Sequence, residues 1–320
     1  MSRPDFPRTI FEFQRQFNTE EACLKYLIAS RWPRGFSCPR CGHDSFYWKA
    51  ARKLLECKQC RYQASVTAGT VMHRSRQPLT IWFQAAYLVT THTPGFSALQ
   101  FQRQVGIPSY KTAFMMLHKL RAALVKEDRE KLRGVVEVDE TYVGGAEAGP
   151  GGRGARGKAI VVGAVEVRGE RAGRIRLRVV KNVTGMSLEA FVQLNVEAGS
   201  TVRTDAFAGY FGLLRLGYNH TPLLGAKSSG LPYIHRVFSN LKSWLIGTHH
   251  GVSDYHLPAY LNEYVFRFNR RKTPMAAFQT ALGLIGERKG PTYKGLYAVG
   301  AGGTEWEHPN PDELDRGFRS

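Results

Sequence analysis

The spacing of apolar residues changes once along the chain. Between residues 78 and 125 they recur every three to four positions, which predicts helices. From Gly134 onward they recur at every second position, which predicts strands. The predicted strands cover residues 135–143, 159–167, 174–180 and 201–205, with a fifth near 220–224. Helices are expected from Ser187, which caps the first of them, and from about Ile234 and Tyr255, so the second half of the chain has an α+β order.

That order is specific. Three strands, a helix, a strand and then further helices is the order of a ribonuclease-H-like domain. We therefore predict an α+β fold in which a ribonuclease-H-like catalytic domain is preceded by smaller units. A glycine-rich segment, residues 144–157, lies between two of the strands and continues into G-x-x-x-x-G-K at residues 152–158. A P-loop is rejected because Ala159 replaces the metal-binding Ser or Thr and a strand follows instead of a helix; a flexible basic loop is expected.

The helical half contains a compact pair of helices. Ser97 is placed to cap a short helix ending near Val105, residues 106–109 form a turn, and residues 110–125 carry apolar side chains on one face. A short helix, a glycine-containing turn and a second helix match a helix-turn-helix, although any helical hairpin has the same pattern. The polar residues expected to project toward DNA from the second helix are Lys111, His118, Lys119 and Arg121.

Four of the five cysteines form two Cys-x2-Cys pairs. Cys38 and Cys41 make the first pair, and Cys57 and Cys60 make the second. Such pairs deliver four thiolates to one tetrahedral zinc ion, with residues 45–55 forming a hairpin between them. Disulfides are the alternative, and the lack of a secretory signal disfavours them. We predict one structural Zn²⁺, and expect Cys23 to be a small buried residue.

The net charge of +19 and the sequence pI near 9.9 indicate a polyanionic partner. The excess is uneven: residues 1–133 hold 22 Lys and Arg against 9 Asp and Glu. The N-terminal part is therefore the expected nucleic-acid reader, although a generally basic surface would give the same composition. No apolar run approaches the roughly 18 to 20 residues of a membrane span, and the first residues have no signal-peptide core. We expect a cytoplasmic protein without membrane contact.

Acidic residues are scarce in the second half, so their positions are informative. Asp139 lies inside an apolar strand and shares one face with Glu137, while Asp205 ends another strand. Carboxylates from neighbouring central strands can hold one or two Mg²⁺ ions for phosphodiester chemistry. A third ligand is sought on the helix beginning near Ile234, where Asn240 borders the apolar stripe. Glu263 is the alternative third residue, and Glu137 is a candidate for an accessory role.

The same segments resemble a known family. VEVDETYVGG, TDAFAGY and especially HRVFSNLKSWLIGTHHGVSDYHLPAYLNEYVFRFNRR are similar to the catalytic domain of IS1595-family, ISXO2-like insertion-sequence transposases. The CPRC and CKQC pairs and the helical region after them are similar to the family's N-terminal part, so the likeness covers about residues 10 to 290. It implies a DDE-type triad whose third member is often Asn, here Asp139, Asp205 and Asn240. Lys242 matches a basic residue that the family has beside the triad.

The resemblance implies a transposase. With Mg²⁺ or Mn²⁺ at the triad, it would bind the terminal inverted repeats of its element, cut the DNA and join the freed 3′-hydroxyl to target DNA. A basic run after the last long helix is expected to grip phosphates: Arg267, Arg270, Arg271 and Lys272. Pairing two double-stranded ends suggests a homodimer or a larger assembly, in a bacterial-type protein associated with the nucleoid. The alternative function is a non-catalytic zinc-ribbon and helix-turn-helix regulator derived from a transposase.

The expected domains follow from these patterns. Residues 1–66 comprise N-terminal helices and the zinc ribbon, and residues 67–133 the helix-turn-helix region. Residues 134–289 form the catalytic domain, and residues 290–320 a C-terminal tail that is acidic over residues 303–320.

Overall fold

The computed structural model describes residues 6–125, 129–144, 158–223, 230–287 and 290–292. Residues 1–290 form one compact unit and residues 291–320 a second. The predicted glycine-rich loop and almost all of the predicted tail lie outside the described residues. None of the described helices is long and apolar enough to span a membrane.

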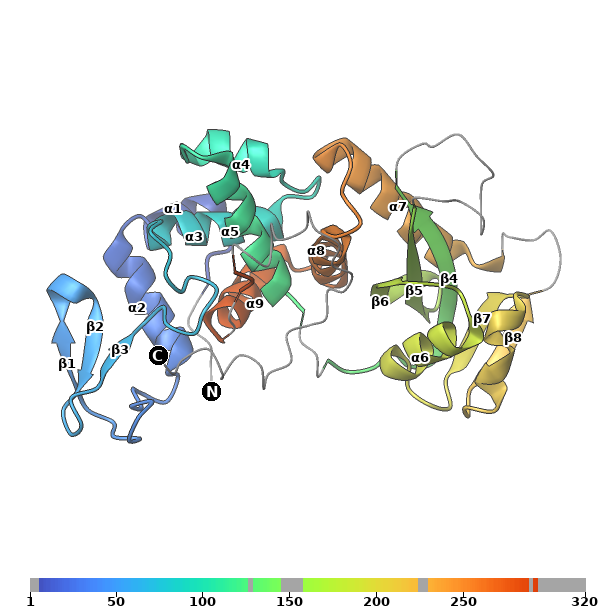
Figure 1. Cartoon of the computed structure of the whole chain (residues 1–320), viewed down its shortest axis with the longest axis horizontal. Helices are drawn as coiled ribbons and strands as arrows, with labels where there is room; N and C mark the ends of the chain where they lie inside the picture. The colour runs from blue at the N-terminus through green and yellow to red at the C-terminus, as the bar shows by residue number, and fades with distance from the viewer. Residues whose placement is uncertain (1–5, 126–128, 145–157, 224–229, 288–289, 293–320) are drawn as a thin grey trace. The chain divides into compact units, whose positions relative to one another are not determined.

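A five-stranded mixed sheet forms the centre of the second half of the chain (Figure 1). Its strands are β4 (Val135–Val143), β5 (Ala159–Arg168), β6 (Arg171–Val180), β7 (Thr201–Asp205) and β8 (Asn219–Leu223). Their order is β6-β5-β4-β7-β8; the first three are mutually antiparallel, whereas β7 pairs parallel with both β4 and β8. This is the ribonuclease-H-like arrangement that the sequence predicted.

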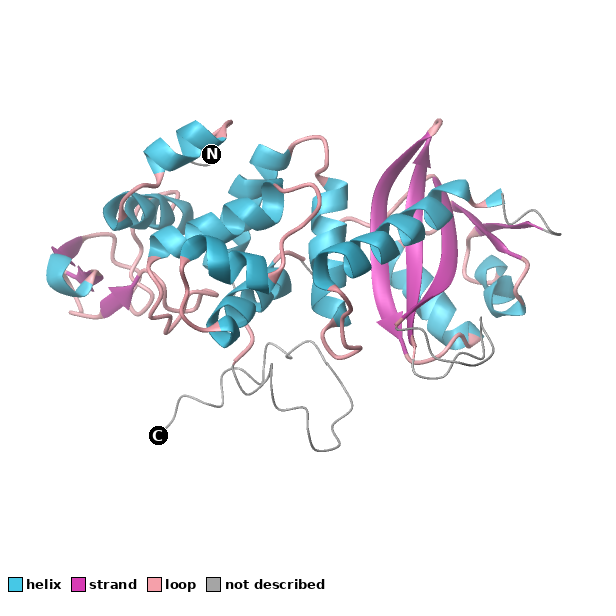
Figure 2. Ribbon diagram, turned by 90° about the horizontal axis from the view of Figure 1, so that it is seen from above, coloured by secondary structure: helices cyan, strands magenta, loops and turns pink. Residues whose placement is uncertain are grey.

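Helices cover both faces of this sheet. Helix α6 (Gly185–Asn195) and the 3₁₀ segment η3 (Ala208–Leu214) pack on the face that carries Val136 and Val138. Helix α7 (Pro232–His249) and helix α8 (Leu257–Asn269) contribute to the core on the other face, as Figure 2 shows for α7 lying across the strands. The alternation of β4 thus places apolar residues toward α6 and turns Glu137 toward α7.

One glycine allows α7 to approach the sheet closely. A Cβ on Gly163 of β5 would lie 2.6 Å from a ring carbon of Phe238. Because Gly163 pairs with Asp139, this contact fixes the position of α7 beside that carboxylate.

The expected cap of α6 was wrong by three residues: the Thr184 side chain accepts a hydrogen bond from the Ser187 N–H.

The first half of the chain is mainly helical. It comprises α1 (Ile10–Gln16), α2 (Glu20–Arg31), α3 (Leu79–Thr91), α4 (Ala98–Val105) and α5 (Tyr110–Ala123), with a small sheet of β1 (Phe46–Lys49), β2 (Leu54–Cys57) and β3 (Gln63–Ser65) and the 3₁₀ turn η1 (Ala50–Arg52) between β1 and β2. Ser97 caps α4 as expected, because its side chain accepts from the Gln100 N–H. Cys23 is fully buried in α2.

The last described helix, α9 (Pro274–Glu287), belongs to the core of the N-terminal helices. The Phe278 ring makes edge contacts with Phe13, Phe17 and Tyr87, which come from α1, the end of α1 and α3. The chain therefore returns to its N-terminal core after the sheet. The domain expected for residues 134–289 includes α9, whereas the buried side chains of α9 belong to a core made mainly of residues 13–124.

Candidate active site and zinc centre

Asp139 lies in the middle of β4, and Asp205 lies at the end of the neighbouring parallel strand β7. Strand β4 pairs with β7 as far as Glu137 and Arg203. Two residues further along each strand, the same register reaches Asp139 and Asp205. The carboxyl end of β7 and the part of β4 just beyond its pairing with β7 therefore bring together the two acids that the sequence singled out.

A third carboxylate joins them. Oxygen atoms of Asp139, Glu140 and Asp205 all lie within 4.8 Å of one another. The Tyr210 hydroxyl donates a 2.8 Å hydrogen bond to Glu140 Oε2, which holds that side chain in place. Sequence reasoning missed Glu140 because strict alternation assigns it to the opposite face from Asp139. Both residues lie in the part of β4 beyond its pairing with β7.

Burial and the neighbouring negative charges both affect the pKa of Asp139. Burial, followed by the charges of Glu140 and Asp205, raises the pKa of Asp139 to about 6, despite opposing contributions from the Glu140 N–H and His235. Burial and the nearby carboxylates also raise the pKa of Tyr210 well above its ordinary value. A divalent cation among these oxygens would offset that repulsion, which is the behaviour expected of a hard-metal site.

A histidine in the first turn of α7 contacts one carboxylate of this cluster. The Nε2 atom of His235 lies 3.0 Å from Asp139 Oδ2. Glu137 holds the start of the same helix: its buried Oε2 accepts hydrogen bonds from the backbone N–H groups of Tyr233 and Ile234, each 2.9 Å long. A carboxylate at a helix N-terminus is stabilising, so Glu137 positions α7 relative to β4. This is the accessory role left open by the sequence.

Asn240, expected as the third member of the triad, lies elsewhere on α7. It follows His235 by five residues, or about 140° around a helix of 3.6 residues per turn. Its side chain is exposed and forms no hydrogen bond among the residues that the structure describes. Lys242 is also exposed. Partial desolvation of its ammonium group, together with the charge of the nearby Lys158, lowers its pKa. The helix residue brought to the carboxylates is thus His235, and Asn240 in this role remains unsupported.

Glu263, the alternative third acid, is committed to a different contact. It is fully buried in α8 and its Oε2 accepts a 2.7 Å hydrogen bond from Arg121 Nε, in an ion pair with no exposed surface on either side chain. The guanidinium of Arg121 also stacks on Tyr260, 4.2 Å from the ring centroid. Glu263 therefore joins α5 to α8 and is not part of the carboxylate cluster.

Two of the four DNA contacts expected on α5 are wrong. Arg121 and His118 are 0% and 1% exposed, so neither can reach a phosphate. Burial, followed by the charge of Arg121, lowers the pKa of His118 well below its ordinary value. The amphipathic pattern did not reveal that α8 covers a second face of α5. Lys111 is exposed and Lys119 half-buried, so both remain predicted DNA contacts.

The basic run at the end of α8 is partly used within the protein. Arg267 donates to the carbonyls of His92 and Thr93 in the loop between α3 and α4. The guanidiniums of Arg270 and Arg271 stack on Phe266 and Phe268. Lys272 is exposed. These contacts give Arg267, Arg270 and Arg271 roles that do not require DNA, and the phosphate contacts of the run stay predictions.

The four paired cysteines converge as the sequence predicted. Their sulfur atoms lie within 4.8 Å of one another, with 3.6 Å between Cys38 and Cys60 and 3.6 Å between Cys41 and Cys57. A disulfide needs about 2.05 Å, whereas sulfurs held about 2.3 Å from one tetrahedral zinc are about 3.8 Å apart. Burial opposes ionisation of Cys38, but the backbone N–H groups of Arg40 and Cys41 lower its pKa to about 7. The cluster fits a structural zinc ion.

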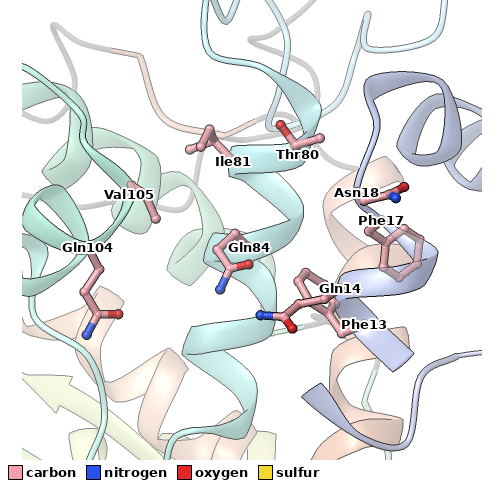
Figure 3. Close-up of a pocket in the computed structure, with 9 residues that line it drawn as sticks. All are labelled: Phe13, Gln14, Phe17, Asn18, Thr80, Ile81, Gln84, Gln104 and Val105. Carbon is pink, nitrogen blue, oxygen red and sulfur yellow. The ribbon is translucent and has the colours of Figure 1, made fainter. Parts of the chain in front are cut away.

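A groove of about 430 Å³ lies in the helical half, between α1, α3 and α4. Figure 3 shows the side chains that line it: Phe13, Gln14, Phe17, Asn18, Thr80, Ile81, Gln84, Gln104 and Val105. It holds amides and apolar groups but no titratable side chain. Its composition sets it apart from the carboxylate cluster, whose residues come from β4 and β7.

Two family profiles match this chain. Residues 131–269 match the ISXO2-like transposase domain of the DDE type, and residues 18–63 match the transposase zinc-ribbon domain. The sheet, the carboxylate cluster and the ribbon therefore define a DDE-type transposase. The chain belongs to the IS1595 family of transposases, as its sequence motifs indicated.

Other comparisons are more distant. No match was found among curated proteins. The catalytic core domain of BIV integrase is similar over 40% of this chain and 80% of its own, with 15% identity and a TM-score of 0.30. A simian T-cell lymphotropic virus intasome in complex with PP2A regulatory subunit B56 gamma is similar over 55% of this chain and 66% of its own, with 15% identity and a TM-score of 0.27.

Proposed function

We propose that this transposase binds the inverted repeats at the ends of its own insertion sequence and catalyses metal-dependent strand cleavage and strand transfer. The observation that carries the proposal is the convergence of Asp139, Glu140 and Asp205 oxygens from the two neighbouring parallel strands β4 and β7. Structural acids at strand ends are common, but three within 4.8 Å, one with a raised pKa, favour a functional site.

The residues at this site fit Mg²⁺ or Mn²⁺. Asp139 and Asp205 would hold the ion, and Glu140, which Tyr210 orients, is close enough to assist. When bound, such an ion lowers the pKa of an attacking water or hydroxyl and stabilises the leaving oxygen of a phosphodiester. The protein would contribute two fixed carboxylates, a half-buried environment that strengthens their attraction for a cation, and a helix that packs beside the site.

We propose His235, in place of Asn240, as the third residue of the triad. His235 already contacts Asp139, whereas Asn240 is exposed further along α7. An imidazole beside a carboxylate can ligate a metal or accept a proton, and imidazole suits transition metals better than Mg²⁺. Mn²⁺ is therefore expected to support activity at least as well as Mg²⁺.

The DNA would contact basic side chains that remain exposed or half-buried. Lys111 and Lys119 on α5 are proposed to meet the element end, and Lys242 and Lys272 to meet phosphates near the scissile strand. Because two ends must be held together for joining, the active form is proposed to contain at least two copies of the chain. A DNA substrate of this kind also places the protein at the bacterial nucleoid.

Cleavage of the natural DNA ends tests the proposal. The substrate is a labelled duplex made from the DNA that flanks the gene, incubated with the zinc-loaded protein and Mg²⁺ or Mn²⁺. Asp139→Ala and Asp205→Ala are expected to abolish nicking and joining while end binding is retained. A wild-type protein that binds the ends but never cuts them with either metal would instead support the non-catalytic regulator.

A further inference from the structure

One face of the zinc ribbon carries an exposed aromatic ring among cations. Tyr47 in β1 is 45% exposed although it lies in a paired strand, opposite Glu56 of β2. The ammonium groups of Lys49 and Lys58 lie 5.9 and 5.2 Å from the centre of its ring. The Arg61 guanidinium carbon lies 5.4 Å from the same centre. We call this set, Tyr47 with Lys49, Lys58 and Arg61, the Tyr47 face.

The charge on the Tyr47 face is not balanced by acids. Glu56 is the acid paired there: it lies 3.4 Å from both Lys49 and Arg61, and its side chain is only 12% exposed. Lys58 has no acidic partner among the described residues. Three cations against one covered carboxylate leave an excess of two positive charges around the ring. Arg61 also adopts a left-handed backbone conformation, with φ 59°, immediately after the second cysteine pair. The turn that holds the metal site therefore also sets the position of this cation.

These features together match one kind of ligand. Duplex DNA covers the faces of its bases by stacking, so it offers an exposed ring only groove edges and phosphates. A strand whose bases are unpaired offers base faces and phosphates together, and proteins bind such strands with aromatic platforms flanked by cations. A protein partner would not require three cations around one aromatic ring. A stacked base has a phosphate on each side of it, and those phosphates are held by cations that flank the ring.

We propose that the Tyr47 face binds an unpaired segment of a DNA strand, with a base stacked on Tyr47 and the adjacent phosphates held by Lys58 and Arg61. The proposal rests on the proposed function only in taking DNA as the polyanion. It concerns the ribbon, not the carboxylate cluster, and assigns the ribbon a binding role in addition to its folding around zinc.

Trp48 provides a matched control. It is the next residue in β1, is exposed to a similar extent at 42%, and pairs with the buried Leu55. Because neighbouring residues of a strand point to opposite faces, Trp48 is an aromatic residue on the other side of the same ribbon. Replacing it removes as much exposed aromatic surface without touching the Tyr47 face.

The experiment compares a single strand with a duplex. Full-length, zinc-loaded protein is titrated against a labelled mixed-sequence strand of about 16 nucleotides, the upper site size of one small binding domain, and against the duplex of the same sequence. Fluorescence anisotropy is read without added Mg²⁺, so the outcome is independent of catalysis. Tyr47→Ala is expected to weaken single-strand binding about tenfold, as the loss of one base stack does, with little change for the duplex. Trp48→Ala and Tyr47→Phe are expected to bind as the wild type does.

Three results would overturn the proposal. The first is equal affinity of Tyr47→Ala and Trp48→Ala for the single strand. The second is an equal loss for strand and duplex in Tyr47→Ala, which would assign the face to ordinary duplex phosphates. The third is failure of Tyr47→Phe to retain binding when its zinc content is normal, since the ring is what the proposal requires.

Discussion

The imidazole Nε2 of His235 lies 3.0 Å from Oδ2 of Asp139, so the first turn of α7 contacts one carboxylate of the cluster. This contact links the helix to the strand that carries the first acid of the site. Glu137, two residues before Asp139 on the same face of β4, reinforces it by accepting two backbone hydrogen bonds from the same end of α7.

His235→Ala should lower the rate of end cleavage by about 10- to 100-fold, the usual cost of removing a residue that ligates or orients a metal ligand. Asn240→Ala, on the same helix but exposed, should cleave at close to the wild-type rate. Single-turnover cleavage of a labelled element end measures both. The reverse ranking would restore Asn240 as the third residue of the triad.

Glu166 should make the fold sensitive to acid. It is 1% exposed on its side chain; burial raises its pKa, but hydrogen bonds and charge from Arg174 outweigh burial and lower the pKa to about 2. Because the folded-state pKa lies below the ordinary value of 4.5, the stabilisation is complete above that value and is lost as the pH falls toward 2. Urea midpoints measured from pH 6 downward should fall less steeply for Glu166→Gln. Parallel curves for the two proteins would contradict this assignment.

Glu263→Gln should destabilise the protein strongly. The change leaves the buried Arg121 charge without its counter-charge, and breaking a buried pair in this way costs about 3 to 5 kcal/mol. Equilibrium urea unfolding measures the cost. The double variant Arg121→Met with Glu263→Met removes both charges and should recover much of the loss; a double variant less stable than Glu263→Gln would show that the pair itself supplies the stability.

Removal of zinc should unfold the ribbon and expose its thiols. The purified protein should contain one zinc ion, and a strong chelator should make Cys38, Cys41, Cys57 and Cys60 reactive toward a thiol reagent. Cys23, buried in α2, should stay protected, since burial, followed by the Glu20 charge, raises its pKa to about 12. Reaction of all four ribbon cysteines before chelation would exclude a zinc site.

Much of the fold could be predicted from the sequence because its signals are local. The strand periods, the Cys-x2-Cys pairs and the Ser97 cap each depend on a few consecutive residues. The rotation of α7 about its axis does not depend on local sequence. It depends on Phe238 packing over Gly163 and on Glu137 binding the helix start, and both contacts join distant segments. The apolar stripe of α7 places both His235 and Asn240 beside it, so sequence could not choose between them.

The same reason explains the error on α5. Its apolar residues define one buried face, and the sequence leaves His118 and Arg121 on the polar side. The second partner, α8, begins more than a hundred residues later and buries that side as well. Without knowledge of this packing, a polar residue on a basic helix is naturally interpreted as a DNA contact.

The most direct test of the central claim is metal-dependent cleavage of the element end by the wild type beside Asp139→Asn and Asp205→Asn. These changes keep the shape of each side chain and remove its charge, and binding of the same DNA is measured without metal as the control. The account predicts cleavage by the wild type with Mg²⁺ or Mn²⁺, and none by either variant, at equal DNA affinity. Full cleavage by either variant would show that these carboxylates do not form the active site.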